Sequence, residues 1–393
     1  MLAMRFVQFA DTHLDSYISG AIRLGSDRSA ALLRDLRTAF SRACALAVER
    51  HADLVLIPGD LFDYETADAS TAAFLMKTLA EIAPIRVFIT PGNHDSLRPG
   101  SPYLPVTASS QWPGNVHIFT SPRFESVSIE ELGCSITGIA HAHRGITDRI
   151  LAAPVRRPAC PINILLFHGS RDGYKPSEKE TVIPFSDAEL LSQGYTYAAI
   201  GHYHSFAAIQ DHNGCVRGAY SGCTQGRGLD ETGEKCVLVG EIDLEGNVAL
   251  ERVEVASRRI ISVDADITGC RDNAAVLSRM DAAVSGKARE CDVLCVSLSG
   301  LLPPGLDLDT AGWESSQSCF GVNVGAAGIQ PDYDLEALAR ESAASPLKSS
   351  FVKKMLEREA QAATDEDKKV LHDAVYYGLY ALDGKKLEPR DAD

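Results

Sequence analysis

The N-terminal half of the chain repeats one pattern: a short apolar run ends in a polar cluster and is followed by a stretch with helical spacing. Residues 29–50 and 67–82 place apolar residues three and four positions apart, which predicts amphipathic helices. They separate three apolar runs that we expect to be strands, at residues 5–10, 54–58 and 86–90. Strands joined by crossover helices are parallel, so the pattern predicts two βαβ units.

Two later apolar runs, at residues 163–167 and 197–200, also end in polar residues. The histidines that follow them are His168, His202 and His204. Residues 207–255 then show short strand-like runs separated by Gly and Asn turns, which is typical of an antiparallel sheet that completes the domain. The expected fold class is α/β, with a mixed-sheet β-sandwich flanked by helices.

The C-terminal third changes character at Arg258-Arg259. A strand, a helix and a second strand are expected there, at residues 260–267, 273–285 and 293–298. Residues 301–332 contain Pro303-Pro304-Gly305 and are expected to be loop-rich, and helical patterns follow at 333–344, 346–360 and 366–382. We therefore predict three parts: a main domain at 1–257, a small α/β capping domain at 258–332, and a helical tail at 333–393.

Composition is that of an ordinary folded protein, with 45% hydrophobic and 23% charged residues. No apolar run reaches the roughly 18 residues that span a bilayer, and the first residues lack the features of a signal peptide, so we expect a cytoplasmic protein without membrane contact. The net charge of −15 opposes a nucleic-acid role. Residues 1–259 carry only −6 of it (24 basic and 30 acidic), and two bound divalent ions would add +4.

Five short motifs carry the candidate chemistry, and each comes where an expected strand ends. Ligands of open α/β sheets gather at the carboxyl ends of the strands, so we expect these motifs to form one site. Their carboxylate, imidazole and amide groups suit Mn, Fe or Zn better than an all-oxygen calcium site. The motifs are Asp11-Thr12-His13, Gly59-Asp60-Leu61-Phe62-Asp63, Gly92-Asn93-His94-Asp95, His168 alone, and Gly201-His202-Tyr203-His204.

Such a set predicts a pair of divalent ions that share one carboxylate. Two ions roughly 3.5–4 Å apart can hold a hydroxide, polarise a phosphoryl oxygen and stabilise both ends of an in-line displacement. The motifs therefore predict hydrolysis of phosphate esters.

Taken together and in this order, the motifs resemble those of the calcineurin-like metallophosphoesterases, and within that family the SbcD-like and YhaO-like DNA repair exonucleases. The resemblance covers residues 4 to about 255 and implies the metallophosphoesterase fold. It implies that Asp60 bridges two metals, and that His94 faces the scissile phosphate as general acid or transition-state stabiliser, with Asp63 accepting its other ring proton. The implied ligands are Asp11, His13, Asp60 and His204 for the first metal, and Asp60, Asn93, His168 and His202 for the second.

Position 64 favours a nuclease within this resemblance. The phosphatase branches follow the second Asp of Gly-Asp-x-x-Asp with an Arg that clamps a terminal phosphate, whereas this chain has Tyr64. A His-Leu-Asp-Ser spelling at 13–16 is closer to the YhaO-like branch than to the SbcD branch, which has Gly at the place of Asp15. We therefore expect a metal-dependent DNA exonuclease acting in DNA repair.

Manganese is the expected metal, with Fe, Zn and Mg as alternatives, and DNA is the expected partner. The family's helical tails dock on an SbcC-like coiled-coil ATPase, so the same partner is expected here, and a homodimer is left open. Two rivals also stay open. One is a phosphatase or cyclic-nucleotide phosphodiesterase acting on small molecules, and the other is a scaffold that binds DNA ends or an ATPase.

Further residues have both a functional and a structural interpretation. Tyr17 and Tyr203 border the motifs and either stack on a base or pack in the core. His141 and His143 follow an apolar run, and they either approach the site or have only a structural role. Basic loop residues either contact a DNA backbone or form solvated surface: Arg98, Arg144, Arg149, Arg156, Arg157, Arg171, Lys175 and Lys179.

Overall fold

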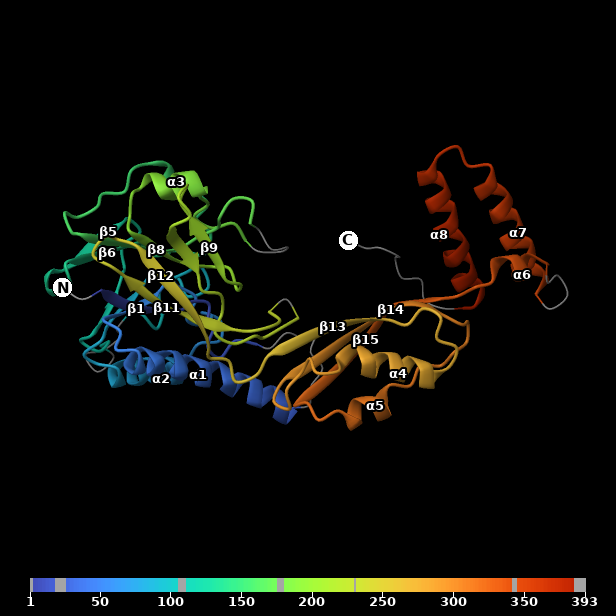
Figure 1. Cartoon of the computed structure of the whole chain (residues 1–393). Helices are drawn as coiled ribbons and strands as arrows, with labels where there is room; N and C mark the ends of the chain where they lie inside the picture. Colours follow the sequence, from blue (N-terminus) through green and yellow to red (C-terminus); the bar gives the residue numbers. More distant parts are fainter. Residues whose placement is uncertain are drawn as a thin grey trace. The chain divides into compact units, whose positions relative to one another are not determined.

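The computed structural model describes residues 3–17, 26–104, 111–174, 180–229, 231–340 and 345–384. The chain divides into two compact units (Figure 1). The first consists of Met1–Asp264, Ala283–Ser297 and Ala311–Gly325, and the second of Ala265–Ala282, Leu298–Thr310 and Ala326–Asp393.

The first unit contains two six-stranded mixed sheets, as expected for a sandwich. In the first sheet the order is β12-β11-β1-β2-β3-β4, with β1 to β4 parallel and with β11 and β12 antiparallel at one edge. Its strands are β1 (Met4–Gln8), β2 (Leu54–Ile57), β3 (Arg86–Ile89), β4 (Val116–Ile118), β11 (Cys236–Ile242) and β12 (Val248–Glu254).

The second sheet has the order β5-β6-β7-β8-β10-β9, with four parallel central strands and an antiparallel strand at each edge. Its strands are β5 (Glu125–Ile129), β6 (Cys134–Gly138), β7 (Ile162–His168), β8 (Tyr197–Gly201), β9 (Ala207–Gln210) and β10 (Val216–Tyr220). Within the described residues, the 3₁₀ helices η2 (Glu130–Leu132) and η3 (Ile150–Ala152) lie in the connections.

Helices cover the outer faces of the two sheets. In Figure 1, α1 (Ser26–Glu49) and α2 (Ala69–Glu81) lie against the sheet that contains β1, and α3 (Asp187–Ser192) lies beside β8. The start of α2 is fixed by a capping box, in which the Asp68 carboxylate accepts from the backbone of Ser70 and Thr71, and the Thr71 side chain accepts from the Asp68 backbone.

Alternation of side chains along the strands builds the core in layers. On β1, Phe6 belongs to the cluster between the sheets, whereas Val7 belongs to the cluster under the helices. On β7, Leu166 points to the space between the sheets and Phe167 to the layer that contains α3. Successive side chains on a strand point to opposite faces, and because both faces of β1 and β7 are covered, every residue of the two strands except Arg5 is buried.

A third sheet has the strand order β13-β14-β15, formed by β13 (Ile260–Asp266), β14 (Val293–Leu302) and β15 (Gly321–Pro331). The remaining helices are α4 (Asn273–Val284), α5 (Ala311–Ser316), α6 (Leu335–Arg340), α7 (Pro346–Ala360) and α8 (Asp365–Leu382). The last three share a small core around Val352, Val375 and Leu379. Residues 341–344 and 385–393 of the expected tail lie outside the described residues. None of the described helices has both the length and the apolar composition needed to cross a membrane.

Two expectations from the sequence were wrong. Residues 301–332 are not mainly loop, because they include α5 and the eleven residues of β15. Strand β15 lies at a sheet edge and is largely unburied, so its Gly-rich sequence carries no alternation of apolar and polar residues. Residues 207–255 do not form one antiparallel sheet, because β9 and β10 extend the second sheet while β11 and β12 extend the first.

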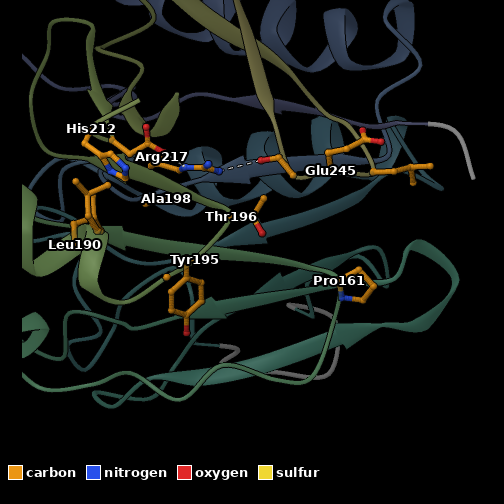
Figure 2. Close-up of a pocket in the computed structure, with 13 residues that line it drawn as sticks. Pro161, Leu190, Tyr195, Thr196, Ala198, His212, Arg217 and Glu245 are labelled. Carbon is orange, nitrogen blue, oxygen red and sulfur yellow. Dashed lines mark hydrogen bonds and ion pairs between the residues drawn. The ribbon is translucent and has the colours of Figure 1, made fainter. Parts of the chain in front are cut away.

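A cavity of about 450 Å³ lies beside the start of β8, where Tyr195 and Thr196 line it (Figure 2). Arg217 crosses this cavity and donates from Nε to Asp211 and from Nη1 to the Gly246 carbonyl, at 2.9 and 3.0 Å. The candidate ligands His202 and His204 follow the other end of β8. The cavity is therefore separate from the site predicted from the motifs.

Candidate metal centre

The predicted ligands all lie where parallel strands end, on both sheets of the sandwich. Asp11, Asp60 and Asn93 follow β1, β2 and β3, while His168 is the last residue of β7. Parallel neighbours end at the same edge, so the sandwich brings the motifs of both sheets together. All seven predicted ligands are buried, with no more than 9% of any residue exposed.

The backbone at these positions turns sharply. Asp11, His13, Asp60 and His202 have φ values of 51°, 41°, 54° and 114°, which non-glycine residues seldom adopt. Gly201, just before His202, allows a close backbone approach, because a Cβ at that position would lie 1.9 Å from the Pro58 carbonyl oxygen. The small residues before the ligands therefore serve close backbone contact as well as turning.

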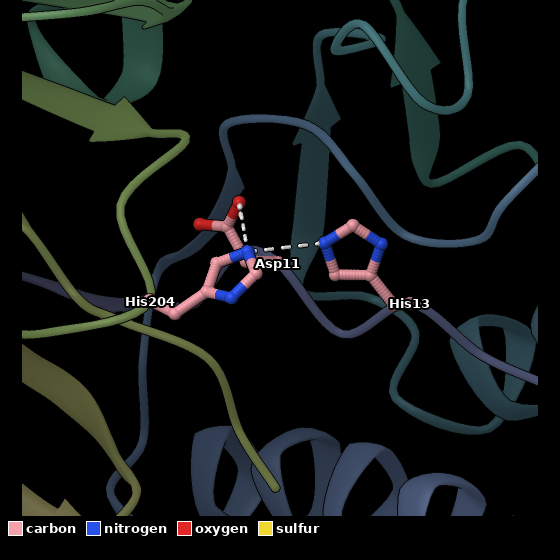
Figure 3. A group of neighbouring side chains, drawn as sticks. All are labelled: Asp11, His13 and His204. Atoms are coloured by element: carbon pink, nitrogen blue, oxygen red, sulfur yellow. Dashed lines mark hydrogen bonds and ion pairs between the residues drawn. The ribbon is translucent and has the colours of Figure 1, made fainter. Parts of the chain in front are cut away.

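Asp11, His13 and His204 form the first group (Figure 3). The Nε2 atoms of His13 and His204 lie 3.3 Å apart, and His204 Nε2 lies 3.9 Å from an Asp11 oxygen. Each ring also meets a carboxylate at Nδ1, which is 2.5 Å from Asp63 for His13 and 2.6 Å from Glu231 for His204. A neutral imidazole that donates from Nδ1 has its lone pair on Nε2. Two lone pairs and the Asp11 carboxylate then face one another.

Asp60, Asn93 and His168 form the second group. His168 donates from Nδ1 to the Pro58 carbonyl at 2.9 Å, so its lone pair is on Nε2. That atom lies 3.2 Å from an Asp60 carboxylate oxygen and 3.0 Å from Asn93 Oδ1. The same Asp60 oxygen lies 3.7 Å from Nε2 of His13. Asp60 therefore stands between the two groups.

His202 adjoins the second group through its ring and the first through its backbone. Its ring centroid is 5.1 Å from that of His168. Its Nε2 donates to the Glu180 carbonyl at 2.9 Å, so its lone pair is on Nδ1, and its backbone N–H donates to both Asp11 oxygens at 3.1 Å.

The charges in this cluster favour a bound cation. Burial acts to lower the pKa of His168, but the Asp60 carboxylate outweighs it and raises that pKa to about 9. Burial acts to raise the pKa of Asp60, and the neighbouring histidines hold it well below its usual range. Converging carboxylates and imidazole lone pairs suit borderline divalent cations, so the residues present fit a metal centre.

His94 and Asp63 lie beside this cluster and are more accessible, with side chains 28% and 19% exposed. His94 Nδ1 is 3.3 Å from the Asp63 oxygen that also accepts from His13. Burial opposes protonation of His94, but Asp60 and Asp63 outweigh it and raise its pKa. The expected pair is thus brought together, with Asp63 shared between two histidines.

Some residues of the site were not predicted. Asp95 stands inside a motif, yet its role is structural: it accepts from the backbone N–H groups of Asp60, Leu61 and Gly92 and from the Tyr103 hydroxyl. Glu231 lies in a glycine-rich segment outside every motif. The only signal for it in the sequence is an opposite charge four residues earlier, at Arg227.

The structure distinguishes between the two interpretations of several residues near the motifs. Tyr203 is 1% exposed and packs in the core, whereas Tyr17 is 84% exposed. Buried His141 is within hydrogen-bond distance of the His168 carbonyl, from its Nε2 at 3.0 Å, and His143 is exposed. Lys175 and Lys179 lie outside the described residues.

Comparison with known proteins agrees with this geometry. Residues 4–206 match the calcineurin-like phosphoesterase family. The chain is 27% identical over 300 residues to the uncharacterized metallophosphoesterase YhaO of Bacillus subtilis, covering 75% of this chain and 71% of that one. It is 25% identical over 192 residues to the DNA double-strand break repair protein Mre11 of Saccharolobus solfataricus, covering 47% of each.

Among solved structures, a dimetal phosphatase from Danio rerio matches 65% of this chain and 98% of its own, at 12% identity and a TM-score of 0.39. The family match spans more than half of the chain and contains all five motifs. The chain belongs to the calcineurin-like phosphoesterases and is a metal-dependent phosphoesterase.

Proposed function

We propose that this protein is a two-metal nuclease that hydrolyses phosphodiester bonds in DNA, as an exonuclease acting in DNA repair. The observation that carries the choice of a diester is Tyr64. Its hydroxyl donates to the Pro99 carbonyl at 2.8 Å, and the Arg98 guanidinium lies 3.9 Å from its ring centroid. The side chain at this position thus offers no bidentate fork for a terminal phosphate, which favours an embedded phosphate.

The proposed ligand sets follow the two groups. Asp11, His13 and His204 hold one ion, Asn93, His168 and His202 hold the other, and Asp60 bridges them. Two such ions would polarise the phosphoryl oxygen and supply the nucleophile at neutral pH. Manganese is the proposed metal, because mixed carboxylate, amide and imidazole ligands suit it.

His94 is proposed to act on the substrate and not on the metal. Its Nδ1 faces Asp63, which leaves Nε2 as the ring atom that can donate to a phosphoryl oxygen or to the leaving group. Its partial exposure lets a substrate reach it. Asp63 orients the ring and stabilises its protonated form.

We also propose DNA and a coiled-coil ATPase as partners. DNA repair is the role named for the Mre11 relative, and the YhaO relative is named without one. Helices α7 and α8 expose Leu347 and Val370, by 67% and 64%, which supports docking of the tail on an SbcC-like ATPase. A homodimer stays open.

The test is cleavage of an end-labelled DNA duplex by the purified chain with Mn²⁺. We expect nucleotides to be released, and we expect the release to cease on chelation and in Asp60→Ala. Activity that persists in Asp60→Ala would contradict the two-metal site. Fast hydrolysis of p-nitrophenyl phosphate with intact DNA would instead favour a small-molecule phosphatase, and DNA binding without cleavage would favour a scaffold.

A further inference from the structure

Glu231 is a buried carboxylate outside the motifs that touches a predicted ligand. It lies in the connection between β10 and β11 and is 2% exposed. Its Oε1 atom is 2.6 Å from Nδ1 of His204. A buried carboxylate is costly unless its charge and lone pairs are satisfied, so the surroundings of Glu231 need an explanation.

Arg227 supplies the opposite charge. It donates to Glu231 from its backbone N–H at 2.7 Å, from Nη2 at 2.7 Å and from Nε at 3.3 Å. Its Nη1 reaches the Ser16 hydroxyl at 3.0 Å, and the Ser16 backbone donates to the His13 carbonyl. The pair therefore connects the segment after β10 to the loop that carries the first ligands.

The same segment also holds the backbone of His204. The backbone N–H of Cys223 and the Lys235 ammonium both donate to the His204 carbonyl, at 3.3 Å. Both the ring and the peptide of His204 are thus fixed from one side. With Nδ1 donating to Glu231, the lone pair on Nε2 points to His13 and Asp11.

Glu231 could instead be a ligand, since His204, Cys223 and Glu231 also lie close enough together to hold an ion. The Arg227 guanidinium argues against this. It contacts both carboxylate oxygens of Glu231, so a cation bound there would meet a fixed positive charge at hydrogen-bond distance.

We propose that Glu231, with Arg227 as its counter-charge, is a positioning residue that fixes the tautomer and ring orientation of His204 for a divalent cation at the Asp11, His13 and His204 position. A carboxylate behind a ligating imidazole also makes the ligand nitrogen more basic. The inference rests on the metal centre of the proposed function and is independent of the DNA substrate.

The experiment is titration with Mn²⁺ of the full chain, freed of metal by a chelator. Binding is measured by calorimetry and by the electron paramagnetic resonance signal of free Mn²⁺. Wild type is expected to take up two ions. Glu231→Gln is expected to weaken one of the two binding steps by about 10- to 100-fold and to leave the other within a few-fold. Glu231→Asp should recover part of the affinity. Glu234→Gln is the matched control, because it removes the same charge from an exposed position three residues away.

A double variant keeps the test decisive if Glu231→Gln fails to fold, since that change alone leaves Arg227 buried without its partner. Arg227→Met with Glu231→Gln removes both charges, and one Mn²⁺ step should still be weakened. Wild-type Mn²⁺ affinity in the double variant would overturn the proposal, because Glu231 would then serve only to neutralise Arg227. Equal weakening of both steps would overturn it as well, since it would indicate general loosening of the site.

Discussion

Four histidines of the metal centre each use one ring nitrogen to contact an outer acceptor. Two acceptors are carboxylates and two are backbone carbonyls, so the imidazoles of the first group are backed by negative charge and those of the second are not. The pairs are His13 with Asp63, His204 with Glu231, His168 with the Pro58 carbonyl, and His202 with the Glu180 carbonyl.

His94 and the ligand histidines should respond differently to mutation. We expect His94→Asn to lower kcat by about 10²- to 10⁴-fold, because a positioned proton donor is lost, while Mn²⁺ binding stays at the wild-type level. Hydrolysis of bis(p-nitrophenyl) phosphate and Mn²⁺ titration measure the two quantities. A parallel loss of Mn²⁺ affinity would make His94 a ligand.

Asp95 should matter for stability more than for chemistry. Asp95→Ala leaves three buried backbone N–H groups and the Tyr103 hydroxyl without their acceptor, so we expect a loss of about 2–4 kcal/mol. Asp95→Asn keeps one acceptor oxygen and should cost less. Urea denaturation of the chelated variants checks this order, and equal stability of the two would contradict it.

The sequence was enough to predict which side chains come together, but not the groups that lie behind them. His168 and His202 follow apolar runs, so their place at strand ends could be read from the pattern. Their outer acceptors are the carbonyls of Pro58 and Glu180, and a backbone carbonyl has no residue type to recognise. Glu231 was missed because it lies 27 residues beyond His204, after β9 and β10, and no local pattern links the two positions.

Elements were predictable where burial imposes a period. The expected helix at 346–360 has the bounds of α7, and that expected at 29–50 is close to α1. The alternation of apolar and polar residues did not identify β15, because one edge of this strand is unpaired and few of its side chains are buried. Sheet membership of β9 to β12 was also beyond local patterns, because it depends on which distant strand each one pairs with.

The connection before β14 contains a buried carboxylate whose contribution to stability can be measured. The Asp292 side chain is fully buried and accepts from the side chains of Arg259 and Arg289, which hold the pKa of this carboxyl below its usual range although burial opposes them. We expect Asp292→Asn to lower the free energy of unfolding by about 2 kcal/mol at pH 7. This loss is smaller than for a fully buried ion pair, because solvent screens the partly exposed Arg289.

This contribution should depend on pH. A carboxylate whose pKa is lower in the folded state stabilises the fold above its unfolded pKa of about 3.9, and this stabilisation is lost as the pH falls through the folded value. The difference between wild type and Asp292→Asn in urea denaturation should therefore be full at pH 7 and shrink below about pH 4. A constant difference would show that shape, not charge, is responsible.

At the scale of the whole molecule, a chain of net charge −15 needs local positive charge to bind DNA. Arg144 lies near His94, whose pKa its charge acts to lower. It is 3.3 Å from Glu180 and 3.9 Å from Glu65, and such exposed ion pairs are worth little, so a phosphate can replace them.

We expect Arg144→Met to raise KM for a DNA duplex about 10-fold, as for loss of one charge-assisted hydrogen bond, with kcat unchanged. KM for bis(p-nitrophenyl) phosphate should stay the same, because that ester has no neighbouring phosphate. Arg123→Met, at an exposed position between β4 and β5, is the control. Equal effects on both substrates, or on both variants, would contradict a role in DNA binding.

The left-handed backbone at Asp11, His13, Asp60 and His202 has a consequence for how this protein can change over time. A non-glycine residue in that conformation costs roughly 1–2 kcal/mol, which glycine would avoid. Selection for thermal stability alone would therefore favour replacing these four residues by glycine, at the expense of the side chains that form the metal centre.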